Sequence, residues 1–258
     1  CTGLRNQVDG PDVCNTSVRR HFGSNFSGTL SDLRLYDVNC IISRDARRKE
    51  ELKMAYESLL QTLKNLDNTY GVSGDEAAVA AALRKEMEGL YDEHIEDPMG
   101  NQMFIKYGKN RDRKLVFSSH MDEIGYIINY IEDNGLARFF PVGYHDDRTA
   151  VNQDMVVITD EGKHVYGVTG SKPAHIMSEE EHEQVVKIED LFVDFGTESA
   201  EETRALGVEI GCYMAVAREG YVLNGGKYYT GKAVDDRAGC AVLVETLRRL
   251  KDVELDYT

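Results

Sequence analysis

A histidine and an aspartate two residues apart close a short apolar segment of this chain. His120 and Asp122 follow the run Lys114–Ser119, which is typical of a β-strand. A strand that ends on an imidazole delivers it to the carboxyl edge of a sheet, where open α/β proteins bind their ligands. An aspartate beside the ring can hold its second nitrogen, which fixes the tautomer and raises the basicity. The pair therefore indicates a metal ligand with a supporting carboxylate, and an ordinary, partly buried histidine is the alternative.

A segment with two adjacent aspartates, farther along the chain, supports the hypothesis of a metal site. Asp235 and Asp236 lie in the glycine-marked segment Thr230–Cys240, where a strand is expected to lead into a helix. A carboxylate near a neutral histidine can begin a mixed nitrogen and oxygen site suited to zinc, cobalt or manganese. One aspartate can also bridge two ions about 3.5–4 Å apart, which together polarise a carbonyl and activate water. The alternative is structural, because Asp-Asp-Arg at a helix start is commonly an N-cap with a local ion pair.

Composition narrows the class of protein. The chain has 258 residues and a formal net charge of −15, which argues against nucleic acid or an anionic membrane as a main partner. No apolar run approaches a membrane span and no signal-peptide core is visible. The five cysteines form no Cys-x-x-Cys pair, so a reducing, cytoplasmic location is expected.

The pattern of apolar residues divides the chain into three parts. Residues 1–44 show no sustained period and begin with Cys, so a disordered or adventitious leader is expected there. Helical spacing then predicts an amphipathic helix, and Ser73 with Glu76 predicts a capping box for a second helix through about Leu90. Further elements are expected as strands at Gln102–Tyr107 and Lys114–Ser119, and as a helix at Arg237–Lys251.

A dense set of short strands separates the two acidic segments. The expected strands are Gly125–Ile131, Ala137–Val142, Asp154–Thr159, Val165–Val168, Leu191–Phe195 and Cys212–Ala217. Their spacing indicates a small barrel or sandwich. The sequence therefore predicts an all-β domain at 126–218, inserted between two pieces, 45–125 and 219–258, of an α/β domain. His120 and Asp235 flank this insert, so one site that contains both requires the α/β domain to close around it.

Five ordered stretches resemble the glutamyl and tetrahedral aminopeptidases, which are dinuclear-metal exopeptidases often labelled cellulases or endoglucanases. The stretches are Gly71–Gly74, Asp97–Asn101, Ser119–Gly125, Val168–His175 with Ile188–Asp194, and Gly231–Gly239. The resemblance runs from about Leu52 to the last residue. It implies a zinc-peptidase-like three-layer α/β/α sheet, incomplete in this chain, with the small all-β domain as an insert that mediates oligomerisation.

The resemblance also assigns roles to residues. His120 would bind the first of two divalent ions (zinc, cobalt or manganese), Asp235 would bridge both, and Asp122 would support catalysis by orienting His120. Asp236 is left without a metal-ligand role. Related enzymes imply a non-proline cis peptide at Asp235–Asp236. The histidines expected to be structural or superficial are His94, His145, His164 and His175.

The function implied is that of a metalloaminopeptidase of the EC 3.4.11 type. It would release N-terminal residues from short peptides with metal-activated water, and self-associate through the insert as dimers to dodecamers. The family also requires a Glu-Glu pair after the last helix, a further acidic ligand and a C-terminal histidine, none of which follows Val253–Thr258. A chain that lacks the C-terminal third, and is inactive as given, is therefore expected. The alternatives are a non-catalytic oligomerising remnant and a metal-free, carboxylate-based glycosidase.

Overall fold

The computed structural model describes residues 30–258, with side chains from residue 49 onward. The chain divides into two units, Cys1–Glu51 and Leu52–Thr258, and helix α1 (Leu30–Asp67) includes residues of both. The start of α1 corrects the expected leader, because residues 30–44 are helical. No glycine or proline interrupts the sequence from Leu30 to Asp67, so nothing local ends the helix. The rest of the expected leader, residues 1–29, lies outside the described residues.

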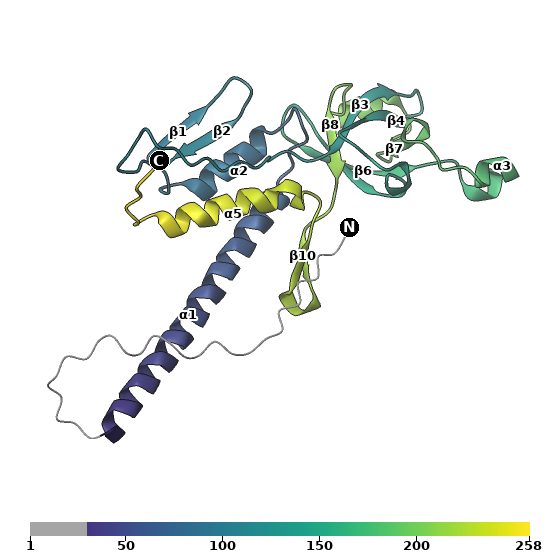
Figure 1. The fold of residues 1–258 in the computed structure, drawn as a ribbon. Coiled ribbons are helices and arrows are strands. Elements are labelled where there is room, and N and C mark those ends of the chain that lie inside the picture. The colour runs from purple at the N-terminus through teal and green to yellow at the C-terminus, as the bar shows by residue number, and fades with distance from the viewer. Residues whose placement is uncertain (1–29) are drawn as a thin grey trace. The chain divides into compact units, whose positions relative to one another are not determined.

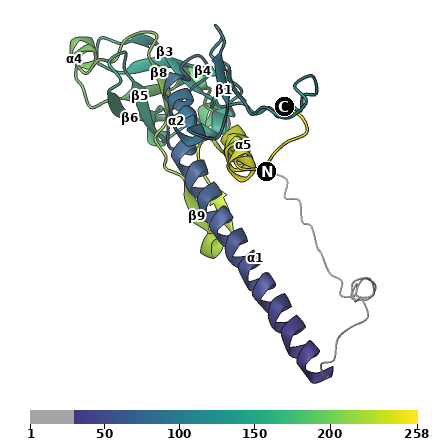
Figure 2. The same ribbon diagram turned by 90° about the vertical axis from the view of Figure 1, so that its left-hand side faces the viewer.

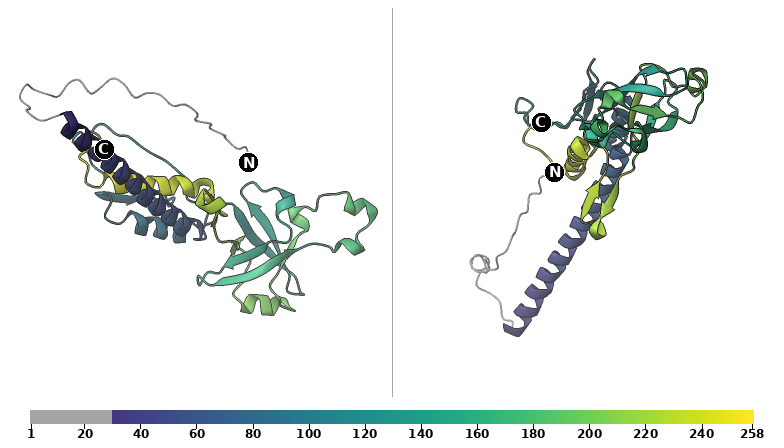
Figure 3. Two further views of the ribbon diagram at one scale, coloured as in Figure 1. Left: turned by 90° about the horizontal axis from the view of Figure 1, so that it is seen from below. Right: turned by 90° about the vertical axis from the view of Figure 1, so that its right-hand side faces the viewer.

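Six antiparallel strands close into a β-barrel (Figures 1 and 3). They are β3 (Gly125–Ile131), β4 (Ala137–Val142), β5 (Asp154–Ile158), β6 (His164–Gly170), β7 (Phe192–Asp194) and β8 (Tyr213–Val216), in the barrel order β3-β4-β7-β6-β5-β8. The six short apolar stretches named above form these strands. Closure pairs every strand on both sides, so the barrel has no open edge.

Apolar side chains that alternate with polar ones along the strands fill the barrel. Side chains of one parity, such as Ile128, Phe139 and Val193, are buried in a single apolar cluster, whereas their neighbours face outward. Short helices connect the strands: α3 (Glu179–His182), α4 (Ala200–Ala205), and the 3-10 turns η1 (Asp147–Thr149), η2 (Ala174–Ile176) and η3 (Ile188–Asp190). The barrel therefore has its own core, built from residues 126–214.

The remaining elements form a second, helical core. The C-terminal part of α1 packs with α2 (Ala77–Met87) and α5 (Val234–Leu250), which lie side by side in Figures 1 and 2. Leu66, Leu83 and Val244 are buried where they meet. Two antiparallel hairpins complete this part: β1 (Glu93–Glu96) with β2 (Gln102–Ile105), and β9 (Tyr221–Leu223) with β10 (Tyr228–Thr230), joined by η4 (Asn224–Gly226).

The strand expected at Lys114–Ser119 is not formed. This segment has no ladder partner within residues 30–258, and its one main-chain bond there joins the Leu115 N–H to the Thr258 carbonyl. Val116 and Phe117 are consequently exposed, at 80% and 60%. A strand requires a neighbour as well as an apolar sequence, which explains the wrong prediction. Along residues 30–258, no helix is long and apolar enough to cross a membrane.

Two adjacent phenylalanines of β4 test the barrel. Phe139 is 2% exposed inside the barrel and Phe140 is 54% exposed outside it. We expect Phe139→Ala to lower the free energy of unfolding by about 3–5 kcal/mol, because it removes a buried ring and leaves a cavity. Phe140→Ala serves as the matched control and should change it by about 0.5 kcal/mol or less. Equal losses in urea denaturation would contradict this barrel register.

Candidate metal centre

The structure brings His120, Asp122 and Asp235 together. His120 Nδ1 lies 3.0 Å from Asp122 Oδ1, and His120 Nε2 lies 3.1 Å from Asp235 Oδ1. The imidazole therefore stands between two carboxylates, one from before the barrel in the sequence and one from after it. It is accessible, since 55% of the His120 side chain and 97% of the Asp235 side chain are exposed.

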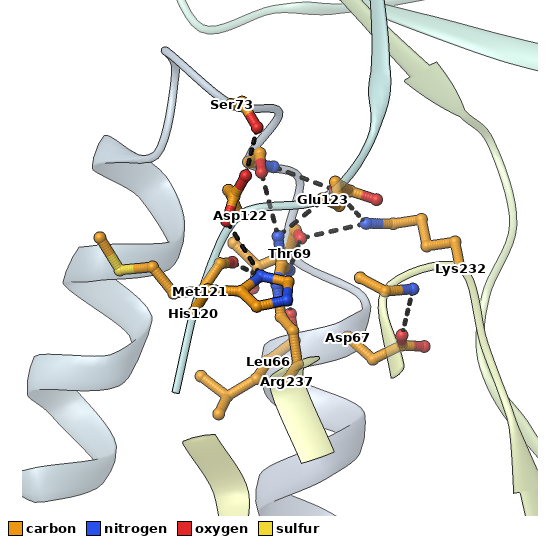
Figure 4. A network of polar contacts seen from close by, with 12 residues as sticks. Leu66, Asp67, Thr69, Ser73, His120, Met121, Asp122, Glu123, Lys232 and Arg237 are labelled. Carbon is orange, nitrogen blue, oxygen red and sulfur yellow. Dashed lines mark hydrogen bonds and ion pairs between the residues drawn. The ribbon is translucent and has the colours of Figure 1, made fainter. Parts of the chain in front are cut away.

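Asp122 is held by Ser73, a residue for which the local pattern predicts another role. The Ser73 hydroxyl donates a hydrogen bond to Asp122 Oδ2, and the other oxygen faces His120 (Figure 4). The expected capping box is therefore wrong: α2 begins at Ala77, and its N-cap residue Glu76 makes no side-chain cap. Glu76 accepts instead from the Gly74 N–H at 2.7 Å. The local sequence around Ser73 gives no sign that its hydroxyl bonds to Asp122, because Asp122 lies 49 positions away.

The two aspartates at the start of α5 make different contacts. The peptide bond Asp235–Asp236 is cis, which confirms that expectation, and both residues have non-helical backbone angles. Asp236 Oδ1 accepts from the Gly239 N–H at 3.0 Å and so caps the helix, whereas Asp235 points to His120. The structural alternative is thus correct for Asp236. Its local ion pair is wrong, because Arg237 makes its contacts elsewhere.

The two carboxylates control the protonation of the imidazole. Burial lowers the pKa of His120, but the hydrogen bonds and charges of Asp235 and Asp122 outweigh it, so the pKa is raised above its ordinary value of 6.5. Burial raises the pKa of Asp122, and the Ser73 hydroxyl and His120 outweigh that effect, so it is lowered. Both shifts therefore favour the charged forms, His120 as an imidazolium and Asp122 as a carboxylate. When the imidazole is protonated, its two N–H groups can donate to Asp122 and to Asp235.

The spacing of His120 and Asp235 fits a shared divalent ion. Two ligand atoms each about 2.0–2.1 Å from a tetrahedral zinc ion lie about 3.3 Å apart, close to the 3.1 Å between Nε2 and Oδ1. The donor set, one imidazole and one carboxylate, also suits zinc, cobalt or manganese. Within the described side chains, no group of three or more His, Cys, Asp and Glu residues is arranged to hold a metal. The pair thus fits part of a metal site.

Buried charged residues behind the pair were not singled out from the sequence. Arg237 is fully buried, Glu123 and Lys232 form an ion pair with 2.5 Å between Oε1 and Nζ, and Asp67 accepts from the Ala233 N–H at 2.8 Å (Figure 4). Their partners lie far away in the sequence, so local patterns give no direct indication of them. The only available signal was the position of Glu123 and Arg237 beside the candidate site residues.

Other candidate groups lie outside the pair. His94 stacks on Phe104, with ring centres 4.8 Å apart, and His145 packs on Tyr126 at 4.4 Å. Cys240 is buried beneath the site, where its sulfur lies 3.3 Å from the His120 carbonyl oxygen. Burial raises the pKa of the Cys240 thiol, which opposes a role as a nucleophile.

The fold and site define a class of protein in which a closed β-barrel interrupts an α/β unit. A histidine and a carboxylate from before and after the barrel in the sequence form a pair. The family model of the M42 glutamyl aminopeptidases matches residues 100–258. The chain belongs to this family. Its α/β fold is shared with solved tetrahedral aminopeptidases.

Individual relatives agree with this membership. The putative aminopeptidase FrvX of Escherichia coli is 30% identical over 196 residues, covering 76% of this chain and 54% of the relative. A TET aminopeptidase structure from a marine-sediment thaumarchaeon has a TM-score of 0.73 at 34% identity, covering 77% and 56%. The Pyrococcus horikoshii TET1 peptidase has a TM-score of 0.69 at 34% identity, covering 77% and 58%. The chain spans about half the length of the curated relatives it matches.

The contact between His120 and Asp235 predicts a pH-dependent effect. We expect the pKa of His120, followed by nitrogen-15 NMR, to lie above 6.5 and to fall in Asp235→Asn. Because the folded pKa is raised, the pair stabilises the fold fully below pH 6.5 and loses this contribution as the pH rises through the folded value. Asp236→Asn, with the same charge change but no His120 contact, is the control. An unchanged titration in Asp235→Asn would contradict the contact.

Proposed function

We propose that this chain carries the first metal-binding elements of a metal-dependent aminopeptidase, an enzyme that releases N-terminal residues from short peptides. M42 aminopeptidases depend on metal, and the relatives described above carry the names of aminopeptidases or peptidases. The observation that carries the proposal is the approach of His120 Nε2 to Asp235 Oδ1 at 3.1 Å, from opposite ends of the inserted barrel. That approach would let the two residues proposed as metal ligands bind one ion together.

The chain's own residues prepare the imidazole for a metal. Asp122, held by the Ser73 hydroxyl, accepts from Nδ1 and so directs Nε2 toward Asp235. The proton on Nε2 has to leave before this nitrogen can ligate, so metal binding should strengthen as the pH rises. His120 and Asp235 would hold the ion, with Asp235 bridging to a second divalent ion. Bound ions of this kind polarise a peptide carbonyl and lower the pKa of water.

The proposal includes inactivity of the 258-residue chain by itself. Among the described side chains only His120 and Asp235 converge as ligands at the site, and catalytic zinc sites in proteins generally have three protein ligands. No carboxylate other than Asp122 and Asp235 contacts His120 among those residues, and both are committed to it. Within the described residues, the carboxylates that contact His120 thus leave no free group there to act as the general base for water.

Activity is tested with a chimera and the chain in parallel. Residues 52–258 would replace the matching residues of the Pyrococcus horikoshii TET1 peptidase, and release of p-nitroaniline from aminoacyl-p-nitroanilides would be followed with added cobalt or zinc. We expect turnover by the chimera, background turnover by its His120→Ala variant, and none by the 258-residue chain. His94→Ala is the histidine control. A folded chimera without turnover would contradict the peptidase function, and robust turnover by the 258-residue chain would contradict its inactivity.

Self-association through the barrel is the second part of the proposal. The Pyrococcus horikoshii TET1 peptidase can assemble into a tetrahedron or a large octahedral shell, and this chain shares its fold. The barrel segment also exposes large apolar side chains that a partner copy could cover. These are Tyr130, Phe140, Tyr144, Tyr166 and Ile176. Assembly would restrict access to short, unfolded peptides.

Light scattering combined with metal analysis separates this function from a purely structural one. The enzyme hypothesis predicts dimers or larger assemblies that bind cobalt or zinc, and loss of the metal in His120→Ala without loss of assembly. Assemblies in which wild type and His120→Ala hold equally little metal would favour the second candidate, a non-catalytic oligomerising member of the family. A strictly monomeric wild-type chain would contradict the role of the barrel.

A further inference from the structure

The chain segment before the barrel meets the segment that follows the barrel and the β9–β10 hairpin. Glu123 directly precedes the residues that lead into β3, and Lys232 follows β10 after one glycine. Although 109 positions separate them, Lys232 Nζ lies 2.5 Å from Glu123 Oε1. Both side chains are 3% exposed, so water screens this ion pair little. We call Glu123 and Lys232 the clasp.

Arg237 ties the clasp to the helical core. Its guanidinium is fully buried and meets five acceptors, which equals its number of N–H donors. The acceptors are the carbonyl oxygens of Met121 (2.8 Å), Gly71 (3.3 Å), Leu66 and Thr69, and Oε1 of Glu123 (3.4 Å). One side chain of α5 thereby holds both the end of α1 and the segment that carries His120.

The clasp lies among buried charges of equal number and opposite sign, and an aromatic ring covers it. Lys232 Nζ also donates to the Thr69 carbonyl at 3.2 Å, and the Gly71 N–H donates to Glu123 Oε1 at 3.1 Å. The Tyr70 ring covers Nζ at 4.6 Å and packs edge-on against His164 of β6, with centres 5.2 Å apart. Two buried acids, Glu123 and Asp67, face two buried bases, Lys232 and Arg237, as burial of charge requires.

We propose that the clasp is a positioning device that sets His120 opposite Asp235. Each clasp residue lies three positions from a site residue, since Glu123 follows His120 and Lys232 precedes Asp235 by that number. Joining Glu123 to Lys232 therefore fixes the two backbone segments that present the imidazole and the carboxylate. The metal-binding consequence rests on the proposed function, whereas the positioning is a property of the metal-free chain.

Hydrogen exchange of the full 258-residue chain tests the positioning without metal. We would compare wild type with Lys232→Met, Lys232→Arg, the double variant Glu123→Gln/Lys232→Met, and Lys227→Met, an exposed lysine in the same connection. The double variant removes one buried charge of each sign, so the buried charges stay balanced if Lys232→Met fails to fold. We expect faster exchange in residues 120–124 and 232–237 together, with β3–β8 unchanged. Lys232→Arg should restore part of the protection, and Lys227→Met should match wild type.

Cobalt binding supplies the second readout, from the absorption bands of added Co²⁺. Loss of the clasp should weaken Co²⁺ binding about 10- to 100-fold, as removal of an outer support typically does. Wild-type exchange in both segments of Lys232→Met and of the double variant would overturn the clasp, as would uniform acceleration that includes the barrel. If wild type binds no Co²⁺, the proposed function fails, and the exchange data alone still decide the clasp.

Discussion

A buried guanidinium with five N–H donors to satisfy is the constraint on which the site depends. Arg237 is fully enclosed, so each donor needs a protein acceptor, and these acceptors come from the end of α1, the Gly71 turn and the segment after His120. Satisfying one side chain therefore fixes two distant segments, residues 66–71 and 121–123, beside α5. Glu123 offsets part of the positive charge and adds the contact to Lys232, which joins the segment before β3 to the segment after β10.

The frame formed by the buried contacts of Arg237, Glu123 and Lys232 explains how the exposed His120–Asp235 pair can hold a defined geometry. His120 and Asp235 lie in accessible positions, where a single ion pair contributes little to stability. Their spacing is set by the buried residues beneath them and by Asp122, which Ser73 holds on the far side of the ring. The barrel has a separate apolar core and joins the frame through Val72, which packs with Val156 and Ala215, and through Tyr70. A large insert can thus interrupt the α/β unit without separating the two site residues.

The sequence predicted those features that depend on local chemistry or on family motifs. Alternation indicated the barrel strands, and the motifs indicated the His120–Asp122 pair, Asp235 and the cis peptide that follows it. Prediction failed where an outcome depends on a distant partner. Lys114–Ser119 has a strand-like sequence but no ladder partner in residues 30–258. Ser73 bonds to Asp122 and does not cap α2, and the acceptors of Arg237 lie more than 110 positions away. The start of α1 at Leu30 differs from the prediction because residues 30–44 lack apolar periodicity but also contain no glycine or proline to end a helix.

The central claim is that buried contacts hold His120 and Asp235 as two ligands of one ion. A crystal structure of the 258-residue chain grown with Co²⁺, with the ion located from its anomalous scattering, tests it most directly. We expect an anomalous peak bonded to both His120 Nε2 and the Asp235 carboxylate, with the Glu123–Lys232 ion pair intact behind it. A peak on other residues, or His120 and Asp235 held apart while that ion pair remains, would contradict it.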